Sequence, residues 1–552
     1  MLRNFVIQTN RHCTSTIPKI SVPYAIKRTP TELLEALNST VGVDKTASHF
    51  AFIDDPITIP STKFRKQTYF QAKELGKRAA RHLASEWPTL FMYDIDEPRL
   101  PVFRPTLPLS MIHFEGTEEE LVKMIEAREI KTAVECYEKI RANGVDVSDK
   151  VQMDLFKLIV YYNENDIPYQ DIEKFPALRN FYSDKLLPLW NEQGLAELLF
   201  ETIKKTPETY SIMIAGMCKH ASSYSANRAK ELYKEMLENN MVPCIEAFNG
   251  LISISQNQDS LRYLEQINKY KIQPTVDTMN ACIMVAKKLD KMKSRLDFIQ
   301  RLILEFRFAN VKPNLYTYHL ILNYLTPKTM KKKPEDYKFV ISVLDQIVTD
   351  LEMANEIKIE NCNDSEFFKT AINVAADANN SKLVERIEKI YSDKKNTVKF
   401  INFQDEDNYY YKYLIYNIIK LPLPELEKLY KELVPRVCGV YKDTLRLLMD
   451  RLFSAPRWSF IKRVVEDSFT INVLNQKSFS KDIRKLLLSV EVHSLSSEDF
   501  LDYRGTLLRC LDIWSEILQK NKKTVSNYVL ILPNIDDEFI TETKKAFSKY
   551  IN

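Results

Sequence analysis

Apolar side chains recur at helical spacing in one segment after another from Gly116 onward. The clearest segments place them at i, i+3, i+4, i+7 and i+8, which is one face of an α-helix. Examples are 229–237, 296–306 and 340–351, and shorter apolar segments precede them at 210–217, 248–252, 279–286 and 318–325. An alternation of short and long helices predicts helical hairpins, and stacked hairpins form a solenoid.

The shorter segments also share an opening that repeats along the chain. They begin with Thr-Tyr-Ser at 209–211, Ala-Phe-Asn at 247–249, Thr-Met-Asn at 278–280 and Thr-Tyr-His at 317–319. A proline precedes three of these openings, where it ends one helix and sets the turn into the next. With unit starts at Pro207, Ile245, Val276 and Leu315, the units are 38, 31 and 39 residues long. The sequence therefore predicts a repeat array.

Weaker copies of this pattern flank the central units. Residues 116–165 contain a further hairpin and a half, while 353–552 are helical but lack the Thr-Tyr-Asn opening. Residues 32–115 are dotted with prolines, which predicts a mostly extended segment around one helix at about 63–86. We therefore expect an all-α protein, a superhelical solenoid of helical hairpins. Its predicted parts are an N-terminal extension at 32–115, a repeat array at 116–352, and degenerate C-terminal helical repeats at 353–552.

The first 31 residues have a composition of their own. They contain five Lys or Arg, several Ser and Thr, and no acid before Glu32. A basic, hydroxyl-rich and acid-free amino terminus is typical of a mitochondrial transit peptide, so we predict import into the matrix. A disordered basic tail is the alternative. Without residues 1–31 the net charge changes from +4 to −1, so the mature chain would be nearly neutral.

Composition excludes several classes of function. Nine glycines in 552 residues leave no glycine-rich loop of the kind that cradles phosphates. The eight cysteines form no Cys-x-x-Cys pair and no zinc-site spacing with histidine, so we expect reduced thiols in a reducing compartment. No run of about 18 apolar residues is present, so no membrane span is predicted. We expect no enzyme activity, catalytic residue, cofactor, metal or small-molecule substrate.

Two unit boundaries carry a family resemblance. The stretches IQPTVDTMNACI at 272–283 and VKPNLYTYHLIL at 311–322 join a proline-containing turn to a Thr-Met-Asn or Thr-Tyr-His opening. In this respect the chain resembles the pentatricopeptide repeat family, whose helical hairpins form an RNA-binding solenoid. The Trp-x-x-Leu-Gly signature of tetratricopeptide units is absent. The unequal unit lengths depart from the regular family repeat, so an even register of one base per unit is not expected.

A closer resemblance emerges when four stretches are taken in order. They are FIDDPITIP at 52–60, SIMIAGMCKH at 211–220, VKPNLYTYHLIL at 311–322 and FQDEDNYYYKYL at 403–414. Together they resemble the pentatricopeptide repeat proteins of the mitochondrial small ribosomal subunit. The resemblance implies a protein that contacts ribosomal RNA and ribosomal proteins and lets single-stranded messenger RNA approach its inner surface. A free RNA-processing or stability factor for particular transcripts, and a protein scaffold that binds no RNA, are the alternatives.

The family resemblance also implies which residues contact bases. In pentatricopeptide repeats, the fifth residue of a unit and its last residue read one base together. Carried over, these positions give three pairs and the opening of a fourth unit: Ser211 with Cys244, Asn249 with Thr275, Asn280 with Asn314, and His319. An asparagine amide can donate to and accept from a base edge, which suits this role. The alternative is that these side chains cap helices or face solvent.

Charge gives a second argument for RNA. Residues 251–340 hold 16 Lys or Arg and 8 Asp or Glu, a net charge of +8 in a mature chain whose total is near −1. Two clusters supply the candidates for contacts with the phosphate backbone: Lys287, Lys288, Lys291, Lys293 and Arg295, then Lys328, Lys331, Lys332 and Lys333. A solvated lysine surface is the alternative. The aromatic run at 409–411 could stack on bases, but its place in a helical pattern favours packing between repeats.

Overall fold

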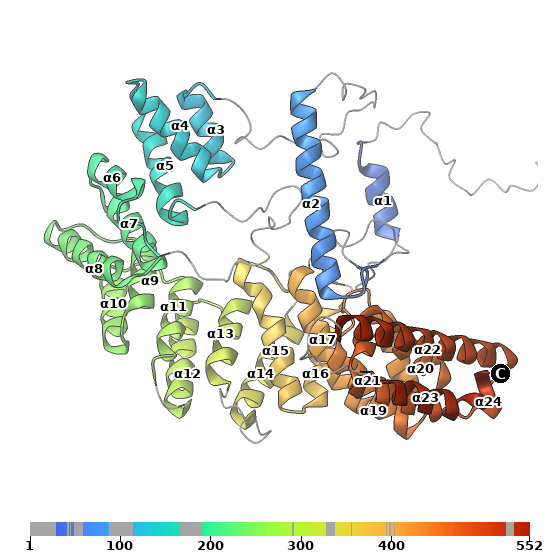
Figure 1. Cartoon of the computed structure of the whole chain (residues 1–552). Helices are drawn as coiled ribbons and strands as arrows, with labels where there is room; N and C mark the ends of the chain where they lie inside the picture. Colours follow the sequence, from blue (N-terminus) through green and yellow to red (C-terminus); the bar gives the residue numbers. More distant parts are fainter. Residues whose placement is uncertain are drawn as a thin grey trace, which may run out of the picture.

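The computed structural model describes residues 29–40, 44, 46–48, 59–87, 114–165, 189–289, 292–326, 337–354, 356–393, 395–396, 399–401, 403–525 and 535–551. In this part of the chain every regular element is a helix, and no strand occurs. Figure 1 shows the helices stacked side by side in an arc, with two N-terminal helices standing off its inner side. The prediction of an all-α helical solenoid is confirmed.

Four hairpins make up the centre of the array. Their helices are α7 (Pro207–Lys219), α8 (Ser223–Glu238), α9 (Ile245–Ile254), α10 (Asn257–Lys269), α11 (Val276–Ala286), α12 (Met292–Phe308), α13 (Leu315–Leu325) and α14 (Lys338–Met353). The four unit starts expected from the sequence are the first residues of α7, α9, α11 and α13. The expected repeat boundaries are therefore confirmed.

Further hairpins continue the stack on both sides. Before the centre lie α3 (Glu118–Glu126), α4 (Ile130–Ala142), α5 (Asp149–Tyr162) and α6 (Leu195–Thr202). After it come α15 (Glu366–Asp377), α16 (Ser381–Tyr391), α17 (Phe403–Lys420), α18 (Leu423–Leu433), α19 (Lys442–Ser454), α20 (Trp458–Thr470), α21 (Lys477–Leu488), α22 (Ser497–Val525), α23 (Asp537–Ala546) and α24 (Ser548–Ile551). The odd-numbered helices pack on one another in succession from α3 to α21. The C-terminal region therefore extends the same solenoid without the sequence opening of the central units.

A recurring turn ends the second helix of the central hairpins. Asn240, Lys271 and Asn310 follow α8, α10 and α12 in the left-handed region, with φ between 54° and 59°. In each turn the next amide donates to the carbonyl five residues back, at 2.8 to 3.0 Å, as in a Schellman cap. A proline follows within three residues, at Pro243, Pro274 or Pro313, and prevents the helix from continuing.

Two glycines allow neighbouring hairpins to pack closely. A Cβ on Gly216 of α7 would lie 2.2 Å from Cγ1 of Val160 on α5 and 2.9 Å from the Val160 carbonyl oxygen. A Cβ on Gly250 of α9 would lie 2.9 Å from the Cβ of Cys218 on α7. Side chains do not approach one another this closely, so both positions require glycine.

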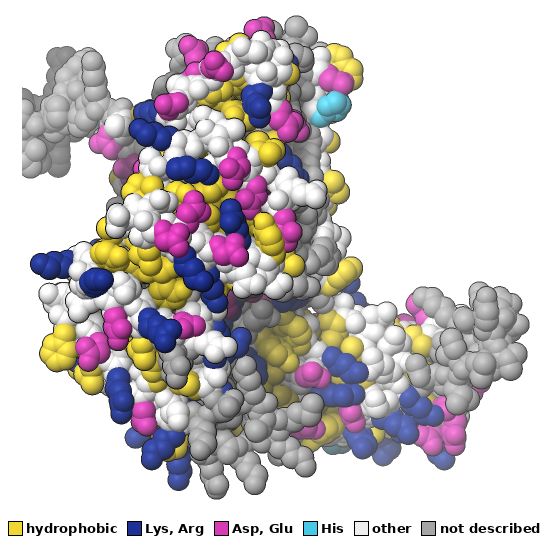
Figure 2. All heavy atoms as spheres, turned by 90° about the vertical axis from the view of Figure 1, so that its left-hand side faces the viewer, with side chains coloured by type: hydrophobic (Ala, Val, Ile, Leu, Met, Phe, Trp, Pro, Cys, Tyr) yellow, Lys and Arg dark blue, Asp and Glu magenta, His cyan; other side chains and the backbone are white. Residues whose placement is uncertain are grey.

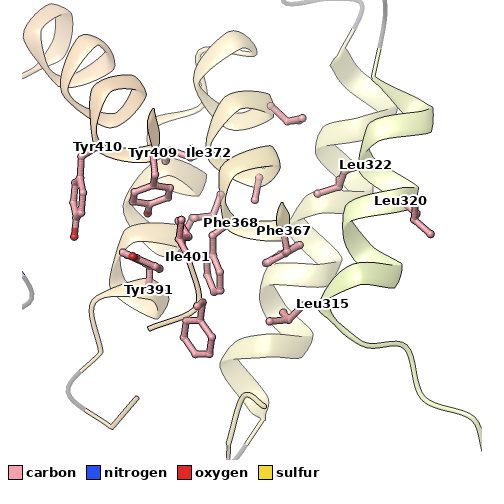
Figure 3. Close-up of a cluster of buried hydrophobic side chains, with 14 of the residues drawn as sticks. Leu315, Leu320, Leu322, Phe367, Phe368, Ile372, Tyr391, Ile401, Tyr409 and Tyr410 are labelled. Carbon is pink, nitrogen blue, oxygen red and sulfur yellow. The ribbon is translucent and has the colours of Figure 1, made fainter. Parts of the chain in front are cut away.

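An aromatic cluster joins the central repeats to the C-terminal ones (Figure 3). Phe367 and Phe368 of α15, Tyr391 of α16, and Tyr409 and Tyr410 of α17 are all buried in it. The ring centroids of Tyr391 and Tyr409 lie 4.6 Å apart, and those of Phe367 and Phe368 lie 5.1 Å apart. The expectation that the tyrosine run packs between repeats is therefore confirmed for Tyr409 and Tyr410.

Two carboxyl groups lie within this cluster. Burial raises the pKa of Glu388 on α16 to about 7, and the Tyr409 hydroxyl donates a 2.7 Å hydrogen bond to Glu388 Oε2. Glu406 is buried, and it accepts from the Tyr391 hydroxyl at 3.0 Å and from Lys399 Nζ at 3.1 Å. A half-buried carboxyl group with a raised pKa therefore lies at the contact between α16 and α17.

Two helices precede the array. The helix expected at about 63–86 is α2 (Lys63–Glu86), so that prediction is confirmed. A second helix, α1 (Glu32–Thr40), has no counterpart among the predictions, because nine residues are too few for a clear periodicity. Figure 1 shows α2 anchored at one end near α17 and extending away from the array over most of its length.

The anchored end of α2 contacts the loop between α18 and α19. The Val440 amide donates to the Ser61 carbonyl at 2.8 Å, and Lys66 Nζ donates to the Arg436 carbonyl at 3.1 Å. Phe70 is buried one turn further along the helix, and burial lowers the pKa of Lys66. These contacts join the N-terminal extension to the C-terminal half of the array.

Some expectations fall outside the described residues. These are the transit segment up to residue 28, Lys291, and the second basic cluster at 328–333. Among the residues that the structure describes, no helix combines the length and apolar character of a membrane span. Within the same ranges, no group of three or more His, Cys, Asp or Glu side chains is placed to hold a metal ion.

Candidate RNA-binding surface

The structure brings together the two members of each pair that the family resemblance predicts to read a base. The fifth residue of α7, α9 or α11 lies on the first helix of its unit, and the paired last residue is the N-cap of the next first helix. Ser211 Oγ accepts from the Cys244 amide at 3.0 Å, and Asn249 Nδ2 lies 3.5 Å from Thr275 Oγ1. The spacing taken from the family resemblance therefore corresponds to spatial neighbours here.

Ser211 is committed to contacts within the protein. Its side chain is buried, and its hydroxyl donates to the Pro207 carbonyl at 2.6 Å while it accepts from the Cys244 amide. The hydroxyl has one proton, so it has none left for a base. At this pair the geometry matches the capping alternative, with Ser211 linking one hairpin to the next.

Asn249 and Thr275 form the most accessible pair. Thr275 is exposed and caps α11, where its hydroxyl accepts from the Thr278 amide. Asn249 is half-buried, and its Oδ1 is a buried atom without a hydrogen-bond partner among the described residues. A base could approach this pair at the exposed Thr275, whereas Asn249 would have to change its side-chain rotamer to present its amide oxygen.

The third pair shares one hydroxyl. Thr317 Oγ1 lies 2.6 Å from Asn280 Oδ1 and 2.8 Å from Asn314 Oδ1. Asn280 is buried, and its Nδ2 lacks a hydrogen-bond partner in the described part of the chain. Asn314 accepts from the Thr317 amide as the N-cap of α13. A base could reach this pair only at the half-buried Asn314.

His319 is held by the following hairpin. Its Nδ1 lies 2.8 Å from Thr370 Oγ1 of α15, and its ring stacks on Tyr316 with the centroids 5.9 Å apart. The imidazole is half-buried in this arrangement. Its position in α13 is that of a fifth residue, and its contacts also join the fourth unit to the C-terminal repeats.

Three acids next to the fifth positions have no place in the sequence-based predictions. Glu208, Glu246 and Asp277 are exposed in the first turns of α7, α9 and α11, three residues before the fifth position and so beside it on the helix surface. They offset the partial positive charge of each helix start. The same charges would repel a phosphate, so an RNA backbone would have to pass away from them. Their recurrence at the second residue of successive units was visible in the sequence.

The first basic cluster is divided between structural and exposed side chains. Lys288 Nζ donates to the Ile254 and Ser255 carbonyls at the end of α9, and Arg295 Nη1 donates to the Tyr324 carbonyl of α13 at 3.2 Å. Burial lowers the pKa of Lys288. Both side chains therefore already bind backbone carbonyls within the protein, and they would have to give up or share these hydrogen bonds to bind an RNA phosphate. Lys287, Lys288 and Lys293 are all exposed, and Lys287 and Lys293 are the candidates that make no such contact with a helix end.

Similar contacts recur elsewhere in the array. Arg451 of α19 donates to the carbonyls of Ile419 at 3.2 Å and Leu421 at 2.8 Å, at the end of α17. Lys219 of α7 donates to the Tyr161 carbonyl of α5 at 2.9 Å. The last carbonyls of a helix carry partial negative charge, so a cation from the neighbouring hairpin stabilises the helix end.

Figure 2 shows basic, acidic and apolar side chains intermingled on the face that it displays.

Comparison with known proteins identifies relatives of the chain. Residues 31–222 match the family model described as small ribosomal subunit protein mS39, PPR. The chain is 28% identical over 461 residues to small ribosomal subunit protein mS39 of Drosophila melanogaster, covering 79% of this chain and 68% of that relative. It is 25% identical over 474 residues to the Mus musculus protein of the same name, covering 82% and 67%. The Xenopus laevis protein is 23% identical over 551 residues, covering 93% and 80%.

Solved structures of pentatricopeptide repeat proteins also resemble the chain at low identity. The pentatricopeptide repeat protein PPR10 from maize is 13% identical, with a TM-score of 0.34, over 84% of this chain and 66% of that one. PPR10 in complex with an 18-nucleotide psaJ RNA element is 14% identical, with a TM-score of 0.29, over 88% and 70%. The family-model match and the curated relatives confirm the resemblance expected from the sequence: the chain is similar to small ribosomal subunit protein mS39, a pentatricopeptide repeat protein.

Proposed function

We propose that the chain is a non-catalytic, RNA-binding component of the mitochondrial small ribosomal subunit and that it supports mitochondrial translation. The observation that carries the proposal is the match of residues 31–222 to the mS39 family model, together with relatives named as small ribosomal subunit proteins. Ribosomal RNA and ribosomal proteins would cover much of the solenoid surface. Single-stranded messenger RNA would approach the inner side of the arc.

The limited number of base-reading pairs supports a general role over a transcript-specific one. Of the three pairs, only Asn249 with Thr275 combines a half-buried amide with an exposed hydroxyl-bearing residue. By analogy with bidentate base contacts, one such pair contributes about 1–3 kcal/mol of discrimination. That cannot select one transcript from many. A ribosomal protein needs no such selection, because other parts of the ribosome position the messenger.

Depletion of the protein tests this proposal. Synthesis of all mitochondrially encoded proteins should fall together, while their messenger RNAs largely persist. The measurement is pulse-labelling of mitochondrial translation with transcript levels determined in the same cells. Loss of one transcript or one product, with the others unaffected, would contradict the ribosomal role and support a free RNA-processing or stability factor.

The proposed compartment has a separate test. Residues 1–31, with five Lys or Arg and no acid, should direct a fused reporter to the mitochondrial matrix. A matched control carries the same segment with its arginines and lysines replaced by glutamine, which removes the charge that import requires. A reporter that stays in the cytosol with the native segment attached would contradict this part of the proposal.

A further inference from the structure

An apolar stripe lies exposed along the projecting part of α2. Ala72, Leu75, Ala79 and Leu83 follow one another at spacings of three and four residues, so they share one face of the helix. All four are exposed, and the side chains of Leu75 and Leu83 are 58% and 42% exposed. The stripe covers three helical turns, about 17 Å. Its alternation of alanine and leucine suits close packing of a second helix.

The short helix α1 also presents an apolar face with nothing packed on it in the described structure. Leu33, Leu34 and Leu37 are 57%, 59% and 62% exposed, and α1 has no buried residue. A helix of nine residues is not stable in water by itself, because nucleation costs more than so few residues return. Three leucines on one side of such a helix indicate that its stability comes from packing on another surface.

Both helices leave the array at the same loop. Thr40 ends α1, and four residues later Asp44 forms an ion pair with Arg436. Lys63 begins α2 two residues after Ser61, whose carbonyl accepts from the Val440 amide. The loop between α18 and α19 therefore contacts the chain just after α1 and just before α2. The apolar faces of both helices thus start from the same point of the array.

We propose that α2 docks an amphipathic α-helix of a neighbouring protein on the stripe from Ala72 to Leu83, and that α1 packs on the same partner through its leucines. The partner helix presents leucine-type side chains at spacings of three and four residues. The polar edges that face α2 are acidic, since the sequence of α2 holds seven Lys or Arg and two Glu, while the surface that meets α1 carries no acid beside Glu32 and Glu35. The inference rests on the proposed function in one respect: the partner belongs to the small ribosomal subunit.

The chemistry of the two faces selects a protein over RNA or a membrane. RNA presents phosphates and polar base edges, which do not bury the leucines of α1. The phosphates would also be repelled by Glu32 and Glu35, the only charged residues of α1. An anionic lipid surface would repel the same two acids. The alanines of α2 also contribute little to insertion into lipid, although they let another helix backbone come close.

Photo-crosslinking in the full chain tests the proposal. A benzophenone amino acid replaces Leu75, Leu37 or, as a matched control, Leu501, an exposed leucine of α22 that is 66% exposed. The variants replace the endogenous protein in cells, and irradiation is applied both to isolated small subunits and to whole mitochondrial lysate. The benzophenone at position 75 and the one at position 37 should each form ribonuclease-resistant adducts with the same polypeptide. The crosslinked site should lie in an apolar helix of that polypeptide. The benzophenone at position 501 should form no adduct with it.

A second variant tests whether the two faces share the partner. Leu75→Asp with Leu83→Asp should lower the crosslink yield from position 37 at least tenfold, while helix content and the thermal midpoint of the free chain stay unchanged, because both leucines are exposed. RNA or lipid adducts, different polypeptides at the two positions, no adduct at position 75, or an unchanged yield at position 37 would overturn the proposal. Absence of the wild-type chain from small subunits would instead contradict the proposed function, and adducts in the lysate would still decide the docking.

Discussion

Replacement of Gly216 by alanine should destabilise the array, although alanine is the better helix former. A Cβ there would lie 2.2 Å from Cγ1 of Val160, 2.9 Å from the Val160 carbonyl oxygen and 3.3 Å from Cζ3 of Trp190. A different rotamer of Val160 could relieve the contact with its Cγ1 methyl group. The carbonyl oxygen belongs to the backbone of α5, so α7 itself has to move away.

The magnitude follows from two opposing effects. Overpacking of a well-packed interface costs typically about 1–3 kcal/mol, and a backbone contact at 2.9 Å places Gly216 at the upper end. Alanine in a helix interior returns about 1 kcal/mol relative to glycine. The net loss at Gly216 is therefore about 2 kcal/mol. At Gly505 of α22 nothing lies within 4 Å of the added Cβ, so the same substitution should stabilise its helix by about 1 kcal/mol.

Native-state hydrogen exchange is the suitable assay, because a long repeat array need not unfold in a single step. A loss of about 2 kcal/mol corresponds to roughly 30-fold faster exchange of the protected amides of α5 and α7. The Gly505→Ala variant should show slower exchange in α22. Equal or slower exchange in α5 and α7 of Gly216→Ala would refute the close approach of these helices. It would also refute the prediction that overpacking at this position outweighs the higher helix propensity of alanine.

Three further predictions concern charge, capping and pH. Lys287→Glu with Lys293→Glu should weaken binding of single-stranded RNA and reduce the slope of log affinity against log salt by about 0.7 for each lost phosphate contact. An unchanged slope in a filter-binding assay would show that both lysines face solvent and contact no phosphate. Ser211→Ala should lower the free energy of unfolding by about 1–2 kcal/mol, because the Cys244 amide loses its acceptor, and should leave base preference unchanged in a binding competition. Burial raises the folded-state pKa of Glu388 from the ordinary 4.5 to about 7, so the native state binds more protons than the unfolded state between these values, and stability falls as the pH rises from 4.5 to about 7 and levels off above it. Glu388→Gln should therefore match the wild type near pH 4 and exceed it in urea unfolding at pH 8; equal stability at pH 8 would contradict the raised pKa of Glu388.

The repeat boundaries were predictable because their signals are local. A proline or a capping residue starts each unit, and Thr275 and Asn314 accept from backbone amides of the helices that they precede. The burial of Tyr409 and Tyr410 was predictable for a similar reason, since their place in a helical pattern of apolar residues favoured packing. Signals of this kind need no knowledge of which helices become neighbours.

The roles of long and polar side chains were less predictable. Lys288 and Arg295 belong to a basic cluster in the sequence, and only the stacking of hairpins brings the carbonyls of Ile254 and Tyr324 within their reach. Ser211 occupies the fifth position that the family resemblance assigns to it. Its burial depends on how closely the Cys244 turn approaches α7, which no local pattern specifies.

Sedimentation of mitochondrial lysate tests the central claim most directly. The chain should move with the small ribosomal subunit in a sucrose gradient, remain there through a moderate salt wash, and keep this position when magnesium depletion separates the two subunits. Ribonuclease digestion of the subunit should release it to lighter fractions. A chain that sediments near the top of the gradient, as expected for a free protein of 64.6 kDa, would contradict the assignment to the small subunit.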